Sequence, residues 1–165
     1  MPKLPNLDKI ILNYSLNLEM LAKRIRKVDK AYKKLEELQN TPRETFFTEN
    51  STEQYATRAA LHMALQALLD IVGHILTRIP GAKHESYRQN VEQLGKKGIL
   101  SEDFLPTAIQ MAGYRGRLVH YYIDIDSKEL YDILQNKLED ITKFKHQLVK
   151  FIDEHKNDTE FLMQR

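Results

Sequence analysis

Residues 51–81 read STEQYATRAALHMALQALLDIVGHILTRIPG, and their periodicity decides the fold class. Apolar side chains recur at steps of three and four residues, which places them on one broad face of an α-helix. These positions are Leu61, Leu65, Leu68, Leu69, Val72, Ile75, Leu76 and Ile79. Ser51 with Gln54 has the form of a capping box, and Pro80 with Gly81 ends the pattern. The segment therefore predicts a long helix whose inward face packs on other helices.

The residues before this helix show a heptad pattern. Apolar side chains alternate steps of four and three. They are Leu7, Ile11, Tyr14, Leu18, Leu21, Ile25, Val28, Tyr32 and Leu35. A seam of about four repeats predicts one long helix packed lengthwise against another. Pro42 ends it, because proline lacks a backbone donor and disfavours the helical conformation of the residue before it.

Three further helices are expected downstream. Residues 85–94 form a short helix closed by glycines. Ser101 and the two acids after it mark the start of a fourth helix that runs into residues 113–126, since such residues favour a helix N-terminus. Asp126, with a glutamate three residues on, begins a long fifth helix that reaches residue 152.

No stretch carries a strand pattern long enough to matter. The expected fold class is therefore all-α, an antiparallel bundle of about five helices. Residues 1–165 are long enough to bury one core, so we expect a single domain, with a polar tail after residue 153.

Composition limits the function classes. The chain has 165 residues, a formal net charge of +2 and no cysteine. The lack of cysteine excludes disulfides and thiolate nucleophiles and fits a reducing compartment. No apolar run approaches the roughly 20 residues that span a bilayer, and no signal-peptide pattern is present. We therefore expect a cytoplasmic protein without a membrane segment, which meets any anionic partner through local Lys and Arg clusters.

The sequence gives no sign of a metal or cofactor site. None of the six histidines pairs with another histidine at metal-ligand spacing. Asp70 and His74 lie one turn apart and are interpreted as a hydrogen-bonded pair at a helix surface. There is no glycine-rich phosphate loop and no hydrolytic triad pattern. We predict neither a bound metal nor a cofactor.

The stretch GYRGRLVHYYIDID, residues 113–126, concentrates the candidate chemistry. It holds two arginines, one histidine and three tyrosines. On a straight helix Arg115 and His120 would lie roughly 140° apart, whereas Arg115 and Tyr122 would share a face. Arg115 and His120 would converge if the helix distorts near Gly116, or if two copies of the segment face each other across a two-fold axis.

Small residues favour the two-copy arrangement. Ala112, Gly113 and Gly116 would let another backbone approach closely. A homodimer would then bring two Arg115 and two His120 side chains into one cleft. One imidazole would take the proton of a ribose 2′-hydroxyl and the other would protonate the leaving 5′-oxygen, while arginine stabilises the phosphorane. The pattern therefore suits metal-independent RNA cleavage. Residue types alone leave one alternative open, in which His120 caps a helix end and the arginines solvate the surface of that helix.

This region resembles the HepT-like toxins of the HEPN (higher eukaryotes and prokaryotes nucleotide-binding) superfamily, over residues 57–152. The signature is an arginine, four residues, a histidine, any residue and a tyrosine, here Arg115, His120 and Tyr122. The resemblance implies a homodimeric, all-helical endoribonuclease toxin with Arg115 and His120 catalytic. It also implies a minimal nucleotidyltransferase antitoxin that transfers AMP from ATP to Tyr122 and so fills the cleft with a bulky anion.

Two residues depart from the family pattern. Gly116 follows the motif arginine where the family usually has Asn, Asp or His, so any hydrogen bond from that position is missing. Tyr121 stands where the family commonly has glycine, and it offers a second acceptor hydroxyl beside Tyr122. We assign Arg117 and Tyr121 a supporting role in RNA binding.

Two other functions stay open. Gly116 favours a catalytically inactive HEPN interaction module that binds RNA or a nucleotide, or that serves as accessory or acceptor subunit of a nucleotidyltransferase. A structural bundle that docks on a larger assembly through its heptad helix requires the signature to be accidental. The sequence contains no recognisable base-reading module, so tRNA, mRNA and ribosomal RNA are all open as substrates.

Overall fold

The computed structural model describes residue 12 and residues 15–120 and 125–157. Over these residues the chain is all-helical and contains no strand. The helices are α1 (Leu18–Gln39), α2 (Arg43–Phe46), α3 (Thr52–Leu76), α4 (Tyr87–Lys96), α5 (Leu105–Val119), α6 (Ser127–Asn136) and α7 (Leu138–His155). The all-α prediction is confirmed, with seven helices in the described part of the chain where about five were expected.

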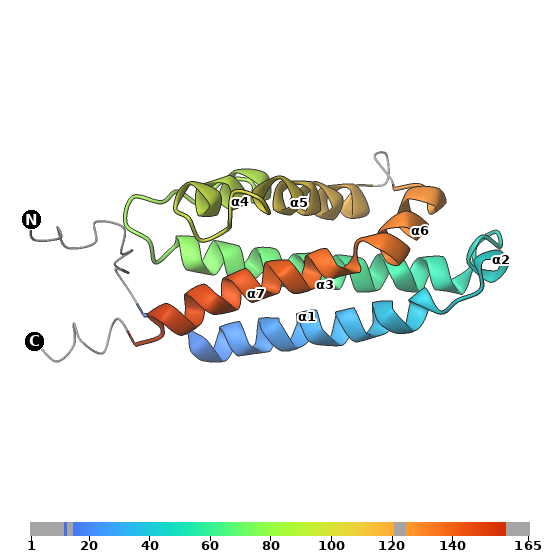
Figure 1. Cartoon of the computed structure of the whole chain (residues 1–165), viewed down its shortest axis with the longest axis horizontal. Helices are drawn as coiled ribbons and strands as arrows, with labels where there is room; N and C mark the ends of the chain where they lie inside the picture. Colours follow the sequence, from blue (N-terminus) through green and yellow to red (C-terminus); the bar gives the residue numbers. More distant parts are fainter. Residues whose placement is uncertain (1–11, 13–14, 121–124, 158–165) are drawn as a thin grey trace, which may run out of the picture.

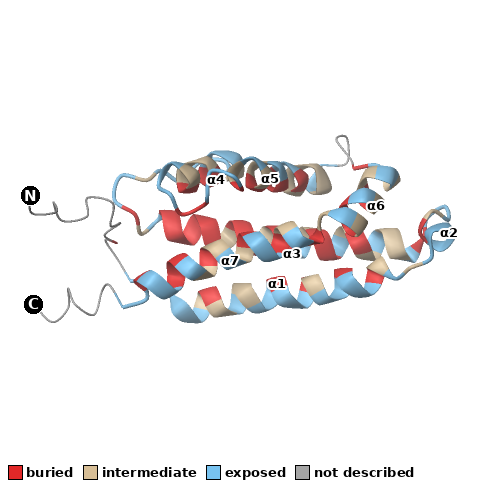
Figure 2. Cartoon of the chain, viewed as in Figure 1, coloured by how far each residue is buried: buried red, intermediate tan, exposed pale blue. Residues whose placement is uncertain are grey.

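Helix α3 lies at the centre of the bundle. In Figure 1, α1 runs antiparallel along one side of α3, and α4 and α5 lie along the opposite side. Helix α7 packs against both α1 and α3. Every position of the apolar stripe expected for residues 51–81 is buried, as the red segments along α3 in Figure 2 illustrate. The stripe is therefore the core on which the surrounding helices pack.

Helix α1 is shorter than expected. It begins at Leu18, where the side chain of Asn17 caps it by accepting a hydrogen bond from the backbone N–H of Met20 at 3.0 Å. The three described residues immediately before Leu18 are not helical, and residues 1–11 and 13–14 lie outside the described residues. Leu18 is 44% exposed, so the heptad seam is wrong at this position. Farther along, the seam is confirmed by the buried residues Leu21, Val28 and Leu35.

The start of α3 is capped as expected but uses its glutamine differently. The Ser51 hydroxyl accepts a hydrogen bond from the Gln54 backbone N–H at 3.1 Å. The Gln54 side chain donates to the carbonyl of Phe46 at 2.7 Å, and the Ser51 hydroxyl donates to the same carbonyl at 2.9 Å. These bonds tie the short helix α2, which the sequence pattern missed, to the N-terminus of α3.

The expected fifth helix is two helices, α6 and α7, separated at Lys137. The Asp126 cap is confirmed, because its carboxylate accepts from the Glu129 backbone N–H at 2.8 Å. Lys137 leaves the helical conformation with φ −124° and ψ 7°. Its ammonium donates to the Tyr114 hydroxyl at 3.0 Å, and this hydrogen bond raises the pKa of Lys137. The break thus brings Lys137 to α5, and Figure 1 shows α6 turned from the direction of α7.

Among the described residues, one helix, α3, is long and apolar enough to cross a membrane. Length and composition alone give this result, and 67% of its apolar window is buried inside the protein. The central helix of a bundle has the same properties, because it is apolar on most of its circumference.

His74 corrects one interpretation of the sequence. It is buried, and its Nε2 accepts a hydrogen bond from the backbone N–H of Asn17 at 3.0 Å. Asp70 forms an ion pair with Arg24 instead, with 3.3 Å between Oδ2 and Nε. The expected surface pair of Asp70 and His74 is therefore wrong. Over the described residues, no three His, Asp or Glu side chains gather as a potential metal site.

We expect the bundle to lose stability in mild acid, partly through His74. Burial, followed by the nearby Arg78 charge, lowers the pKa of His74 from 6.5 to about 4. Between these values the unfolded state binds the additional proton, so the stabilisation is complete above pH 6.5 and falls toward pH 4, by up to about 3 kcal/mol. His74→Gln keeps an acceptor for Asn17 and removes the titration. Urea unfolding at pH 7 and pH 5 should show a smaller pH-dependent loss in this variant; equal losses would contradict the assignment.

Candidate functional site

Helix α5 ends one residue before the motif histidine. His120 is its C-cap, with φ −99° and ψ 106°, and it is exposed. Its backbone N–H donates to the Gly116 carbonyl at 3.1 Å. The straight-helix angle between Arg115 and His120 therefore does not apply, because the chain leaves the helix at the histidine. Tyr121 and Tyr122 lie outside the described residues.

Arg115 is held by two neighbouring helices. Its Nε donates to the side-chain oxygen of Gln66 on α3 at 2.8 Å. Its guanidinium carbon lies 4.5 Å from the centre of the Tyr87 ring at the start of α4. The hydrogen bond and the aromatic ring together fix the orientation of the guanidinium plane. Within the described part of the chain Arg115 interacts with these two side chains, so its Nη groups keep donors that an anion could accept from.

Gln66 is itself fixed on both sides. Its Nε2 donates to Asp70 Oδ1 at 2.8 Å and to the Tyr87 hydroxyl at 3.1 Å. Asp70 in turn pairs with Arg24, so one polar cluster connects α1, α3, α4 and α5. Sequence reasoning missed Gln66 and Tyr87. The available signal was that Gln66 and Asp70 lie four residues apart, hence on one face of a helix that is otherwise largely apolar.

Arg117 has a partner on another helix. Its two Nη atoms donate to the two carboxylate oxygens of Glu129, both at 2.7 Å. This hydrogen bonding is the main reason that the pKa of Arg117 is raised. The pair joins the end of α5 to α6 across residues 121–124. Arg117 therefore holds the end of α5 in place against α6.

A double-mutant cycle measures this pair. We expect Arg117→Ala and Glu129→Ala to show a coupling of about 1 kcal/mol in the free energy of unfolding, because the bidentate geometry is favourable although both side chains are partly exposed. Urea unfolding of the wild type, both single variants and the double variant gives the coupling. Strict additivity of the two single effects would show that the pair does not stabilise the fold.

The outer face of α5 is open at two glycines. Gly113 is exposed and Gly116 is half-buried, and a Cβ on either would meet no atom of the described chain within 4 Å beyond its own helical backbone and neighbours. Ala112 is buried and belongs to the core instead. Two of the three small residues expected at an interface therefore lie where another backbone has room to approach.

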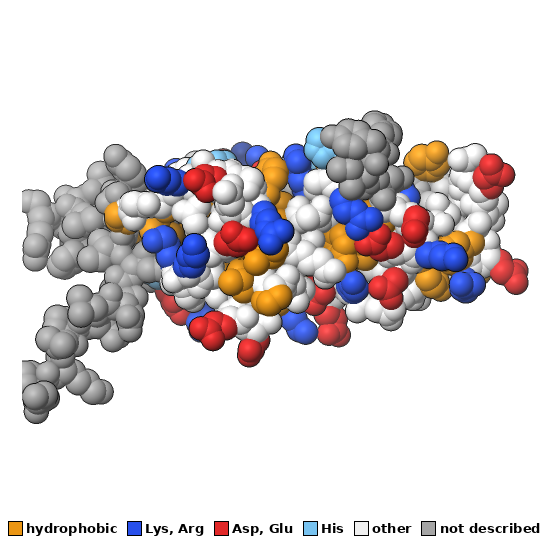
Figure 3. All heavy atoms as spheres, turned by 90° about the horizontal axis from the view of Figure 1, so that it is seen from above, with side chains coloured by type: hydrophobic (Ala, Val, Ile, Leu, Met, Phe, Trp, Pro, Cys, Tyr) orange, Lys and Arg blue, Asp and Glu red, His pale blue; other side chains and the backbone are white. Residues whose placement is uncertain are grey.

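The surface around α4 and α5 is mixed in charge. Figure 3 shows Lys and Arg side chains interspersed with Asp and Glu, without one continuous basic patch. This distribution agrees with the formal net charge of +2. An RNA strand at this face would therefore be bound by individual cations rather than by a broad positive field.

Comparison with known proteins identifies relatives over much of the sequence. The model of a family described as ribonuclease HepT-like matches residues 28–148. The tRNA nuclease HepT of Aphanizomenon flos-aquae (strain 2012/KM1/D3) is 28% identical over 100 residues, which are 61% of this chain and 68% of that protein.

Solved structures share the fold. The tri-AMPylated HEPN toxin of Shewanella oneidensis, in complex with an MNT antitoxin, has a TM-score of 0.67 and 20% identity, covering 81% of this chain and 98% of that chain. YutE from Bacillus subtilis, a cytosolic protein of unknown function, has a TM-score of 0.67 and 18% identity, covering 86% and 94%. The family match spans most of the sequence and includes both Arg115 and His120. The chain therefore belongs to the ribonuclease HepT-like family.

Proposed function

We propose that the protein is a metal-independent RNA endonuclease and the toxin of a toxin–antitoxin pair. The observation that carries the proposal is the arrangement at the end of α5. Arg115 is held by Gln66 and Tyr87 with its Nη groups available to an anion, and the exposed His120 lies just beyond the helix. The related tRNA nuclease HepT supports RNA as the substrate.

The proposed chemistry needs two imidazoles and one anion-binding group. One His120 takes the proton of a ribose 2′-hydroxyl as the 2′-oxygen bonds to phosphorus. The bond from phosphorus to the 5′-oxygen breaks, and the second His120 donates a proton to that oxygen. The Arg115 guanidinium stabilises the negative charge on the non-bridging oxygens. The products are a 2′,3′-cyclic phosphate and a 5′-hydroxyl.

The second imidazole comes from a second copy of the chain. The open surface at Gly113 and Gly116 supports a homodimer in which the two α5 helices approach across a two-fold axis. Such a dimer places both His120 residues in one composite cleft. A cytoplasmic location fits the buried position of α3 and the cytosolic relative YutE.

The proposed partner is a minimal nucleotidyltransferase antitoxin. The Shewanella oneidensis toxin of the same fold carries AMP groups and is bound to an MNT antitoxin. In this chain Tyr122 is the proposed acceptor, with Tyr121 as the neighbouring alternative. The phenol oxygen would attack the α-phosphorus of ATP and release pyrophosphate and a proton. The added AMP would then oppose RNA binding by its charge and volume.

Cleavage of total tRNA in excess EDTA tests the function. Purified protein, shown by intact mass to carry no AMP, is incubated with tRNA and, in parallel, with mRNA and ribosomal RNA, and the product ends are identified. We expect cleavage that leaves 2′,3′-cyclic phosphates, and loss of this cleavage after treatment with the nucleotidyltransferase and ATP. If unmodified protein leaves tRNA, mRNA and ribosomal RNA intact, the toxin proposal fails. Gly116, with open space beside it, would then favour the inactive interaction module.

A further inference from the structure

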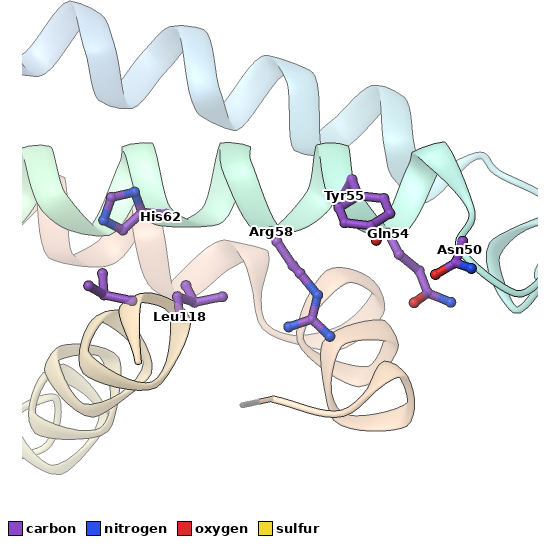
Figure 4. A pocket seen from close by; sticks show the side chains of 7 residues that line it. Asn50, Gln54, Tyr55, Arg58, His62 and Leu118 are labelled. Atoms are coloured by element: carbon purple, nitrogen blue, oxygen red, sulfur yellow. The ribbon is translucent and has the colours of Figure 1, made fainter. Parts of the chain in front are cut away.

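A pocket of about 630 Å³ lies between the first half of α3 and the last turn of α5. Figure 4 shows Arg58 extending from α3 into the space beside Leu118, with Tyr55, Gln54 and Asn50 farther along the same side. The described residues that line it are Asn50, Gln54, Tyr55, Arg58, His62, Leu118 and Val119. The volume is in the range typical of small-molecule sites.

The pocket adjoins the proposed catalytic histidine. Leu118 and Val119 form part of its wall, and His120 follows them directly in the chain. Val119 is 41% exposed, so the wall next to His120 is an accessible apolar surface. A group bound here would therefore be a neighbour of the phosphate that His120 is proposed to act on.

The lining combines one aromatic ring with amides and aliphatic side chains. Tyr55 is 63% exposed, which leaves much of its side chain accessible. Within the described chain the Asn50 amide has no side-chain hydrogen bond and Gln54 uses only its nitrogen, on the Phe46 carbonyl. His62 Nε2 is buried without a hydrogen-bond partner among the described residues. Polar edges around an apolar wall suit a flat, heteroaromatic ligand.

The Arg58 side chain lines this pocket and is held in one position by a hydrogen bond. Its Nη2 donates to the Ile125 carbonyl at 2.5 Å, which ties α3 to the residues just before α6. No Asp or Glu is among the described lining residues, so these residues carry no negative charge that would repel a nucleic-acid strand. The pocket is therefore formed mainly by α3 and α5, and the Arg58 side chain in it is anchored at Ile125.

We propose that this pocket binds the base of a nucleotide that flanks the cleaved phosphate in single-stranded RNA. Tyr55 stacks on the base, and the amides of Asn50 and Gln54 contact its polar edge. Stacking on aromatic side chains is the usual way in which proteins hold unpaired RNA bases, and it contributes about 1–3 kcal/mol per base. The inference rests on the proposed ribonuclease function and adds the subsite that selects the substrate strand next to the scissile bond.

The absence of tryptophan allows a direct test. Tyr55→Trp in a His120→Ala background places one indole in the pocket, and Met63→Trp in the same background places one on α3 outside it. Met63 is also exposed, at 43%, and does not line this pocket. We expect a short single-stranded oligoribonucleotide to quench the indole in the Tyr55→Trp protein and not in the Met63→Trp protein. An abasic oligoribonucleotide should quench much less.

Kinetics supply the second readout. In otherwise wild-type protein, Tyr55→Ala should raise KM for RNA about tenfold with kcat little changed, Tyr55→Phe should restore KM, and Met63→Ala should leave both unchanged. Labelled RNA that binds the His120→Ala protein without quenching Tyr55→Trp would overturn the subsite and leave the ribonuclease proposal standing. Quenching by a free nucleoside monophosphate but not by RNA would reassign the pocket to a mononucleotide. No RNA binding or cleavage by any variant would overturn both proposals.

Discussion

Replacing His120 with alanine is expected to lower kcat for RNA cleavage by about 10²–10⁴-fold, because removal of a positioned acid–base group has an effect of this size. The fold should not change, since His120 lies beyond the last turn of α5, is exposed and contributes no part of the core. The measurement is cleavage of tRNA in EDTA by wild-type and variant proteins, with thermal unfolding as the control. A folded variant that cleaves at the wild-type rate would remove His120 from the mechanism.

Mixing subunits extends this test to the composite cleft. If one His120 acts as base and the other as acid, a dimer of one wild-type and one His120→Ala subunit is inactive. After exchange of equal amounts of the two proteins, about a quarter of the dimers would then carry both histidines. We expect activity to follow the square of the wild-type fraction. A linear dependence would mean that each subunit cleaves alone, and the two-histidine mechanism would be wrong.

The fold could be predicted from the sequence wherever the buried residues repeat with the period of a helix. The apolar stripe of α3 and the seam from Leu21 to Leu35 are local patterns, and each is buried as expected. The break at Lys137 was not predictable in this way, because no glycine or proline marks it. At the break, Lys137 instead donates a hydrogen bond to Tyr114 on α5, and such a contact between helices has no local sequence pattern. Likewise, Asn17 caps α1 in the middle of what reads as a continuous heptad pattern.

The candidate site was predictable in its residues but not in its geometry. The residue spacing of a straight helix predicts that Arg115 and His120 lie on different faces. In the structure the helix ends at Val119, so that spacing does not apply to His120. The residues that hold Arg115 come from α3 and from the first turn of α4, and only tertiary packing brings Gln66 and Tyr87 together. A polar residue that positions another side chain has no sequence pattern of its own. The structure is therefore needed to separate Gln66 from an ordinary surface amide.

Arg115→Ala should lower kcat by about 10²–10³-fold, the effect of removing one preorganised group that stabilises an oxyanion. Arg115→Lys should recover only part of this, because lysine keeps the charge but has no Nε to donate to Gln66 and no plane to lie over Tyr87. Cleavage rates at saturating tRNA give both values. Wild-type kcat in a folded Arg115→Ala protein would contradict the assigned role.

Substitution of Gln66 tests whether the position of the Arg115 guanidinium, and not only its presence, matters for cleavage. We expect Gln66→Leu to lower kcat about tenfold with little change in KM, because a misplaced guanidinium loses much of its effect on the transition state. The decisive measurement is Gln66→Leu in the Arg115→Ala background, where a positioning residue has nothing left to position and the further loss should vanish. An undiminished tenfold loss in that background would instead show that Gln66 acts through the stability of the bundle.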